Sequence, residues 1–391
     1  MTKLKDITGK ALSGEWGTDD ETGVGIPVLR TTNFTNEGSV NYENVVTRII
    51  TKKDISEKYL QSGDIIIEKS GGSDKQPVGR VIYFDGPENT YLFNNFTGLL
   101  RVRDKNEWFP RYVFYSLFAN YKKGGTRPFE NKTTGLHNLK TDDYVSRYEI
   151  TEIPLNKQVA ICAQLDQILK VINLRRKEIS NLDDLIKARF VEMFGDNQEV
   201  HKLSDIAAIT GGLTKNSRRD KLELRKPYLR VANVFFASID TTEILDIGLT
   251  KEEYEKTLLR NGDLLFVEGN GSPDQIGRVA IWNGEIEDCV HQNHLIKARF
   301  DLKRMNPVFA MYYFISERGR NQIKKRAVST SGLYTLSVSK IADFEIPNPP
   351  MELQQQFAAF VAAIDKSKAT VQKALDETQL LFDSLMQQYF G

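Results

Sequence analysis

Residues 262–279, GDLLFVEGNGSPDQIGRV, repeat the pattern of residues 63–81, GDIIIEKSGGSDKQPVGRV. In both segments an apolar run follows Gly-Asp, and a second one follows a stretch rich in Gly, Ser and Asp. Short β-branched runs bounded by turn formers are typical of paired strands joined by a loop. The sequence therefore predicts strands at 65–67, 78–82, 264–267 and 279–282. The glycines between them also allow a backbone cradle for an anion, but neither loop has the G-x-x-x-x-G-K-[ST] spacing of a phosphate loop, which favours a plain turn.

The repetition covers the whole chain. KLKDI (3–7) corresponds to KLSDI (202–206), PVLRTTNF (27–34) to PYLRVANV (227–234), and TTGLHNL (133–139) to TSGLYTL (330–336). Each copy closes in Glu-Ile-Pro and a long helical pattern that stops at Phe-Gly. We predict a mixed α/β (α+β) fold written twice, with domains at 1–155 and 201–350 and helical spacers at 156–200 and 351–391. Residues identical in both copies, expected to serve the fold or phosphate contact, are Arg30 and Arg230, and Arg80 and Arg278.

Both helical patterns place apolar residues at alternating steps of four and three, which is a heptad seam. One alternative is that each helix docks only on its own domain. Because each helix follows a copy of the same unit, an antiparallel coiled coil with pseudo-two-fold symmetry is the favoured closure. The predicted packing residues are Leu165, Leu169, Ile172 and Ile179 in the first helix, and Phe357, Val361, Ile364, Val371, Leu375, Phe382 and Leu385 in the second.

Composition indicates a soluble protein of the cytoplasm. Among 391 residues 40% are hydrophobic and 27% charged, which is ordinary for a globular protein. No apolar run approaches the roughly 20 residues of a membrane span. The two cysteines, Cys162 and Cys289, fall in stretches of different character, which fits a reducing compartment without disulfides.

The net charge of +1 provides no global basic field, but the cations bunch locally. Any single cluster is equally well explained as a solvated face. Their occurrence in matching parts of a duplicated chain points to a polyanion. The candidate DNA-binding residues are Lys122, Lys123, Arg127 and Lys132 in the first copy, and Lys215, Arg218, Arg219, Lys221, Arg320, Lys324, Lys325 and Arg326 in the second.

Catalytic and metal-binding patterns are weak, so no catalytic residue, cofactor or metal is predicted. Asn348–Met351 (NPPM) resembles an amino-methyltransferase motif but has Met in place of the aromatic residue that stacks on a flipped base. Cys289, His291 and His294 imitate metal ligands. The first copy has aromatic residues at these places, so packing at strand positions is the favoured interpretation.

The order of these motifs resembles the specificity subunit of Type I restriction-modification enzymes. Two variable α/β units open with KL-x-DI, contain P-x-LR-x-x-N and a Gly-Asp strand, and close in Ile-Pro before a long Gln-bearing helix. The resemblance implies two target recognition domains separated by an antiparallel coiled coil, and no catalysis. It implies double-stranded DNA, two methyltransferase subunits and restriction (motor) subunits as partners, and no membrane.

Geometry agrees with this resemblance. A helix of about 32 residues is roughly 50 Å long, and DNA turns once in about 34 Å, so two readers could address major grooves about a turn apart. Two other functions stay open at this point: a stand-alone DNA-binding regulator, and a scaffold whose units bind proteins.

Overall fold

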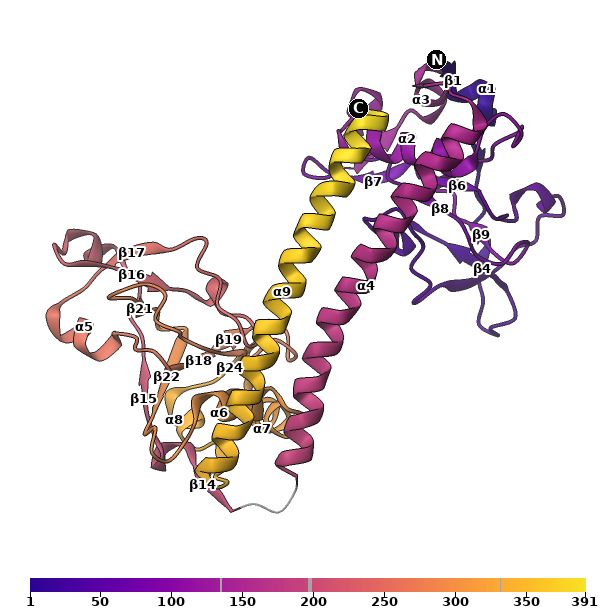
Figure 1. The fold of residues 1–391 in the computed structure, drawn as a ribbon. Helices are drawn as coiled ribbons and strands as arrows, with labels where there is room; N and C mark the ends of the chain where they lie inside the picture. Colours follow the sequence, from indigo (N-terminus) through magenta and orange to yellow (C-terminus); the bar gives the residue numbers. More distant parts are fainter. Residues whose placement is uncertain (134–135, 196–198, 331) are drawn as a thin grey trace. The chain divides into compact units, whose positions relative to one another are not determined.

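Figure 1 shows the chain as a computed structural model, which describes residues 1–133, 136–195, 199–330 and 332–391. The side chains of Lys132, Thr133 and Thr330 also lie outside the described part. The chain forms two compact units: unit 1 consists of Met1–Arg176 and Lys373–Gly391, and unit 2 of Lys177–Gln372. Each long helix therefore contributes residues to both units.

Unit 1 is built around two four-stranded sheets. The first has the order β2-β10-β6-β8, with β2 at Leu12–Ser13, β10 at Thr97–Leu100, β6 at Ile65–Glu68 and β8 at Val81–Tyr83. The second has the order β3-β5-β4-β9, with β3 at Thr18–Asp19, β5 at Val46–Ile49, β4 at Ile26–Leu29 and β9 at Leu92–Phe93. The β4–β9 pair is parallel and the remaining pairs of both sheets are antiparallel.

Smaller elements complete unit 1. Strands β11 (Glu130–Thr133), β12 (Leu136–Leu139) and β7 (Ser70–Gly72) form a three-stranded antiparallel sheet, and β1 (Thr2–Lys3) pairs with β13 (Glu149–Ile150). The helices of the unit are α1 (Leu4–Thr8), α2 (Pro110–Lys122) and α3 (Thr141–Arg147). All four residues of β6 are buried, which explains why Ile65–Ile67 form a continuous apolar run and not an alternating pattern.

Unit 2 repeats the strand orders of unit 1, except that β3 has no counterpart among its described residues. Its sheets have the orders β15-β22-β18-β20, β17-β16-β21, β19-β24-β23 and β14-β25. Their bounds are β14 (Val200–Lys202), β15 (Ala207–Gly211), β16 (Arg225–Leu229), β17 (Leu245–Gly248), β18 (Leu264–Val267), β19 (Gly269–Asn270), β20 (Val279–Ile281), β21 (Val290–His291), β22 (Leu295–Phe300), β23 (Val328–Thr330), β24 (Leu333–Thr335) and β25 (Glu345–Pro347). The β16–β21 pair is parallel, like β4–β9.

Strand β18 shows how both faces of the central sheet become buried. Leu264 and Phe266 point into a cluster with Phe309 and Phe314 of α6 (Pro307–Ile315), whereas Leu265 and Val267 join a separate cluster on the opposite face. Side chains of a strand alternate between faces, so one apolar run supplies both cores. The other helices of the unit are α5 (Lys251–Thr257), α7 (Glu317–Arg326) and α8 (Val338–Ala342).

The strand expected at 78–82 begins only at Val81. The N–H of Val78 donates to Oε1 of Glu130 at 3.0 Å, away from any strand partner, and Gly79 has a φ of 103°, a conformation that favours glycine. The segments between the paired strands are more than turns, because each contains a short strand, β7 or β19, that belongs to the three-stranded sheet.

The long helices are α4 (Leu155–Met193) and α9 (Met351–Phe390). In unit 1 the first half of α4 runs antiparallel to the end of α9: Tyr389 donates to Gln164 at 3.0 Å, and Arg175 bonds to Thr378. In unit 2 the order is also reversed, because Asp183 pairs with Lys368 and Phe190 packs on Phe357. The predicted packing residues are all buried or half-buried. The antiparallel pairing of two long helices is confirmed within each unit.

Candidate nucleic-acid interface

Two buried ion pairs hold the same place in the two units. In unit 1 the guanidinium group of Arg101 donates through Nε and Nη2 to the carboxylate of Asp64, at 2.7 Å each. In unit 2 Arg299 and Asp263 form the same bidentate pair at 2.7 and 2.6 Å. Both aspartates are almost fully buried, and both also accept a backbone N–H from three residues earlier. These pairs fix the turn before the central strand and are part of the scaffold.

The repeated arginines also bond inside their own unit. Arg80 donates to the backbone carbonyls of Thr31 at 2.8 Å and Phe34 at 3.1 Å, and Arg278 donates to that of Val231 at 3.2 Å. The Nη2 atoms of Arg30 and Arg230 donate to the carbonyls of Asn44 and Glu243. These contacts join the segment after β4 or β16 to its surroundings.

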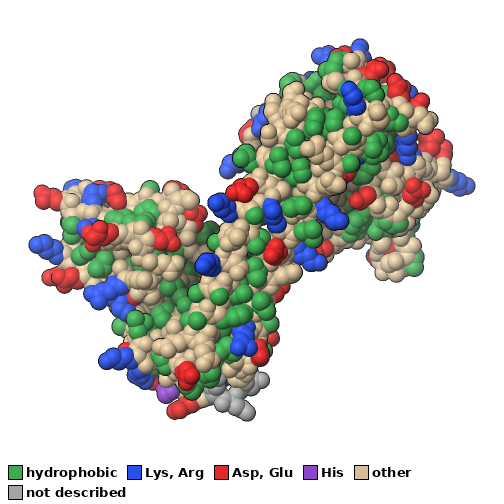
Figure 2. Space-filling view, viewed as in Figure 1, with side chains coloured by type: hydrophobic (Ala, Val, Ile, Leu, Met, Phe, Trp, Pro, Cys, Tyr) green, Lys and Arg blue, Asp and Glu red, His purple; other side chains and the backbone are tan. Residues whose placement is uncertain are grey.

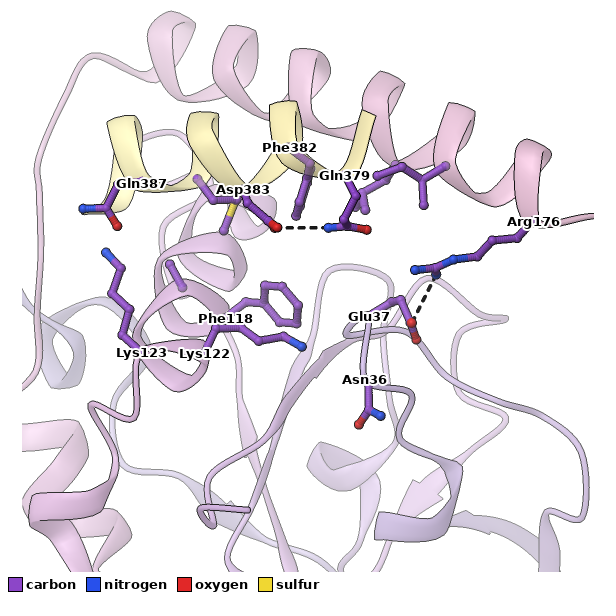
Figure 3. A pocket seen from close by; sticks show the side chains of 14 residues that line it. Asn36, Glu37, Phe118, Lys122, Lys123, Arg176, Gln379, Phe382, Asp383 and Gln387 are labelled. Atoms are coloured by element: carbon purple, nitrogen blue, oxygen red, sulfur yellow. Dashed lines mark hydrogen bonds and ion pairs between the residues drawn. The ribbon is translucent and has the colours of Figure 1, made fainter. Parts of the chain in front are cut away.

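The basic residues at the end of α2 lie beside the long helices of unit 1. Lys123 donates to the carbonyl of Phe390 at 3.0 Å, and the ammonium group of Lys122 lies 5.2 Å from the ring centroid of Phe118. Both lysines line a pocket of about 610 Å³ between α2, residues 36–37, α4 and the end of α9 (Figure 3). Figure 3 also shows the ion pair of Arg176 with Glu37 at its rim. Lys122 keeps its donors available, whereas Lys123 caps the end of α9.

The first cluster has two further residues, Arg127 and Lys132. Arg127 donates to the carbonyl of Asp74 at 3.5 and 3.4 Å, which ties it to the segment between β7 and β8. His137 also contacts Asp74: its Nε2 lies 3.6 Å from Oδ1 of Asp74, and its Nδ1 lies 2.9 Å from Oε2 of Glu130. The backbone of Lys132 belongs to β11, but its side chain lies outside the described residues.

The second cluster surrounds the 3-10 helix η5 (Ser217–Lys221). One of its cations is bonded to a carboxylate, and three are exposed to solvent. Arg219 forms a bidentate pair with Glu253 at 2.9 and 2.8 Å and also donates to the carbonyls of Thr214 and Gly248. Its hydrogen bonds lower the pKa of Glu253. Within the described parts of the chain, no side chain bonds to the charged groups of the exposed residues Lys215, Arg218 and Lys221.

The matching segment of unit 1 has the opposite charge. Residues 15–25 carry four acids and no Lys or Arg. Asp20 accepts bonds from Thr22, Gly23 and Gly25, so its carboxylate closes a local loop. Hydrogen bonds from the Thr47 side chain and the Gly25 backbone lower its pKa. A surface that is basic in one unit and acidic in the other is not a phosphate contact shared by both.

The third cluster, on α7, is mostly engaged with the loop after β19. Arg320 donates to the carbonyls of Gly277 and Asp274 at 3.1 and 3.2 Å, and Lys324 pairs with the Asp274 carboxylate at 2.6 Å. Arg326 bonds to the carbonyl of Asp343. In the part of the chain that is described, Lys325 is exposed and has no side-chain partner. Figure 2 shows that positive and negative side chains are interspersed on the face in view.

The two histidines of the zinc-like pattern, His291 and His294, differ in burial and in their hydrogen-bond partners. His291 in β21 is fully buried, with Nδ1 2.9 Å from the carbonyl of Leu295, and burial together with the charge of Lys297 lowers its pKa to about 3. His294 is exposed and bonds to Glu268, and burial raises the pKa of Cys289 to about 12. Among the described residues no group of three His, Cys, Asp or Glu could hold a metal ion.

The sequence profile of the family described as Type I restriction modification DNA specificity domain matches residues 1–183 and again 195–378. The chain belongs to this family. The resemblance seen in the motifs is thereby confirmed, as is the duplication: the chain has two DNA specificity domains of Type I restriction-modification, and DNA sequence recognition is their function. The regulator and scaffold alternatives are not favoured.

Similar specificity subunits are found among curated proteins. The EcoKI specificity subunit of Escherichia coli (strain K12) and the StySPI specificity subunit of Salmonella potsdam are each 23% identical over 393 residues, covering 93% of this chain and 80% of theirs. A Methanocaldococcus jannaschii protein named for the specificity subunit of the MjaX type I restriction enzyme is 27% identical over 229 residues. That match spans 57% of this chain and half of the relative's length.

Solved structures support the fold of this specificity-domain chain. The S subunit of a Type I restriction-modification system from M. genitalium aligns with a TM-score of 0.56 and 16% identity, covering 100% of this chain and 95% of the other. A chain from a study of assembly and conformational transition in the type I R-M system aligns with a TM-score of 0.57 and 14% identity, covering 100% of this chain and 96% of the other.

No helix in the described part of the specificity-domain chain is long and apolar enough to cross a bilayer.

Proposed function

We propose that this chain is the sequence-recognition subunit of a Type I restriction-modification complex and that it recognises a bipartite site on double-stranded DNA, one half-site per domain. Residues 1–155 and 201–350 would be the recognition domains, and 156–200 and 351–391 the helical spacers. The observation that carries the proposal is a scaffold built twice, down to the ion pairs of Asp64 and Asp263, beneath surfaces that differ. A duplicated scaffold with divergent surfaces suits two readers of different sequences.

The proposal assigns catalysis to the partners. Two adenine methyltransferase subunits would bind this chain, and restriction (motor) subunits would join through the complex, in the cytoplasm. Exposed apolar residues on the long helices support a helical partner. Leu174 and Leu380 are 57% and 72% exposed in unit 1, and Val191 is 67% exposed in unit 2. A solvated helix pair with a single seam does not need these side chains, so we assign them to contact with the methyltransferase.

The exposed cations remain candidates for DNA contact. Lys122, Lys215, Arg218, Lys221 and Lys325 have charged groups that other side chains leave available, and they would neutralise phosphates or bond to base edges. The others among the twelve predicted residues, apart from Lys132, serve mainly to hold loops and helix ends.

Methylation mapping tests the proposal. A cell that expresses this chain with a Type I methyltransferase subunit should contain methylated adenines in one bipartite motif, and none there without this chain. DNA affinity of the purified complex should fall steeply with salt, because phosphate contacts release counterions. A scaffold would show neither effect. A stand-alone regulator would bind DNA fully without any methyltransferase, and would contradict the proposal.

The helical contact has its own test. The double variant Leu380→Gln, Leu381→Gln, which changes two adjacent exposed leucines of α9, should lose co-purification with the methyltransferase. Leu302→Gln, which changes a leucine that is 64% exposed outside the long helices, should not. Unchanged co-purification of the double variant would remove this face from the partner surface.

A further inference from the structure

One surface position is the same in the two units by its backbone bonds, although the loops around it differ in length. In unit 1 the N–H of Lys69 donates to the carbonyl of Phe96 at 2.8 Å, and the carbonyl of Lys69 accepts the N–H of Leu139 at 2.8 Å. In unit 2 the N–H of Glu268 donates to the carbonyl of His294 at 2.9 Å, and its carbonyl accepts the N–H of Leu336 at 2.8 Å. Lys69 and Glu268 are therefore structural equivalents, as are Phe96 and His294.

The side chains at this position are opposite in charge. The ammonium group of Lys69 donates to Oγ of Ser13 at 3.0 Å, and the ring of Phe96 is 54% exposed. In unit 2 Nδ1 of His294 lies 3.1 Å from Oε2 of Glu268, and the His294 side chain is 56% exposed. The position therefore carries a cation bonded to Ser13 in unit 1 and a carboxylate bonded to the imidazole of His294 in unit 2.

Each position lies next to a β-ribbon that turns a face to solvent. Strand β7 precedes a ribbon of β12 and β11 in unit 1, and β19 pairs with β24 and β23 in unit 2. Leu136 and Leu333, at the same place in β12 and β24, are 56% and 47% exposed. The major groove of B-DNA admits a β-ribbon of this size, and apolar side chains there contact the thymine methyl group.

Other divergent surfaces fit DNA less well. Residues 15–25 of unit 1 carry four acids without a Lys or Arg; Glu15 and Asp19 pair with cations of other segments and Glu21 is exposed, so the segment itself offers no cation to phosphates. Glu268, by contrast, is one carboxylate beside an imidazole, and a single carboxylate in the major groove can accept a bond from the N4 amino group of cytosine. A lysine at the same place can donate to O6 and N7 of guanine.

We propose that this matched position determines base choice in each half-site: Lys69 with Phe96 in the first domain, and Glu268 with His294 in the second. The ligand is the major-groove edge of a base pair in double-stranded DNA. The inference rests on the proposed function and deepens it. The opposite charges give the two domains different base preferences on one backbone frame.

The test uses the full chain in complex with its methyltransferase, with the motif first mapped for the wild type. The variants are Lys69→Gln and Glu268→Gln, which remove the charge and keep a polar side chain. The matched controls are Lys105→Gln and Glu255→Gln, at exposed positions of the same units. Relative affinities are measured for duplexes that carry each single base substitution in either half-site.

Lys69→Gln should relax preference at one position of one half-site, and Glu268→Gln at one position of the other half-site, each on the order of tenfold. The controls should keep the wild-type profile. Loss of specific binding with retained non-specific binding would also support a base contact. Two unchanged profiles, or equal loss of specific and non-specific binding, would overturn the inference. If the wild-type complex itself has no motif, the proposed function fails first, and the two failures are distinguishable.

Discussion

The side-chain carbonyl of Gln158 in α4 accepts the backbone N–H of Phe109, just before α2, at 2.8 Å. In unit 2 Gln354 of α9 accepts the N–H of Asn306, just before α6, at 2.7 Å. Both glutamines are fully buried, and their amide groups donate to nearby backbone carbonyls, including that of Ile153 for Gln158. One side chain thus connects each long helix to the domain that precedes it.

Replacing Gln158 by Leu should destabilise unit 1 by about 2–4 kcal/mol, because a buried N–H and two carbonyls lose their partners. Urea unfolding followed by circular dichroism measures the change. Gln167→Leu is the control, since Gln167 lies on the same helix but is exposed. Equal midpoints for the two variants would show that water replaces the Gln158 bonds.

Arg218 and Arg219 are adjacent, yet substitution should affect different properties. Arg219→Ala leaves Glu253 without its bidentate partner, so the free energy of unfolding should fall by about 1–3 kcal/mol, measured by thermal unfolding. Arg218→Ala should keep stability and reduce DNA affinity, with a shallower dependence on salt. A loss of stability in Arg218→Ala, or a loss of DNA affinity without destabilisation in Arg219→Ala, would reverse the assignment.

Acid sensitivity of unit 2 should depend on His291. Its folded pKa of about 3 lies below the unfolded value of about 6.5, so the unfolded chain binds more protons between these values. Stability is therefore lost as pH falls from about 6.5 toward 3, by up to about 1.4 kcal/mol per pH unit. Unit 1 has Phe93 in the equivalent strand, β9.

The variant His291→Phe places the residue of unit 1 at the equivalent position of unit 2 and should unfold at lower pH than the wild type. His294→Phe, which copies Phe96 at an exposed position, is the control and should leave the acid midpoint unchanged. Circular dichroism at constant temperature across pH 3–7 measures both. If His291→Phe and the wild type unfold at the same pH, the acid transition is determined by titratable groups other than His291.

Much of the fold was predictable because its signals are local or repeated. The four-three spacing from Phe357 to Leu385 identifies the helix seam without any knowledge of the partner. The duplicated Gly-Asp segments identify the central strands. Strand β7 and the late start of β8 were missed, because Ser70–Gly72 has no apolar pattern and only its pairing with β12 makes it a strand.

The candidate interface was less predictable, because charge in a sequence does not show which charges already have partners. Arg219, Arg320 and Lys324 look like free cations in a run but bond to carboxylates or carbonyls from distant segments. The equivalence of Lys69 and Glu268 follows from the repeated Gly-Asp segments, in which each residue stands six positions after the glycine, and the backbone bonds to Phe96 and His294 agree with it. The sequence does not show that the carboxylate of Glu268 contacts the imidazole of His294.

The length of the long helices bears on the spacing of the two half-sites. Both are continuous where the chain passes between the units, at 176–177 and 372–373. If they set the spacing of the half-sites, inserting four helix-forming residues at both points should lengthen only the unspecific spacer of the DNA motif. Matched insertions keep the antiparallel partners in register, whereas an insertion in α4 alone would shift the seam.

Four residues add about 6 Å, which corresponds to one or two base pairs, and rotate the helix by a further 40° or so. Methylation mapping should therefore find both original half-sites, with a spacer longer by one or two base pairs and with reduced efficiency because of the rotation. The single insertion after Leu182 serves as the mismatched comparison and should methylate less than the double insertion. Altered half-site bases, or an unchanged spacer in an active double-insertion variant, would show that the helices do not measure the DNA.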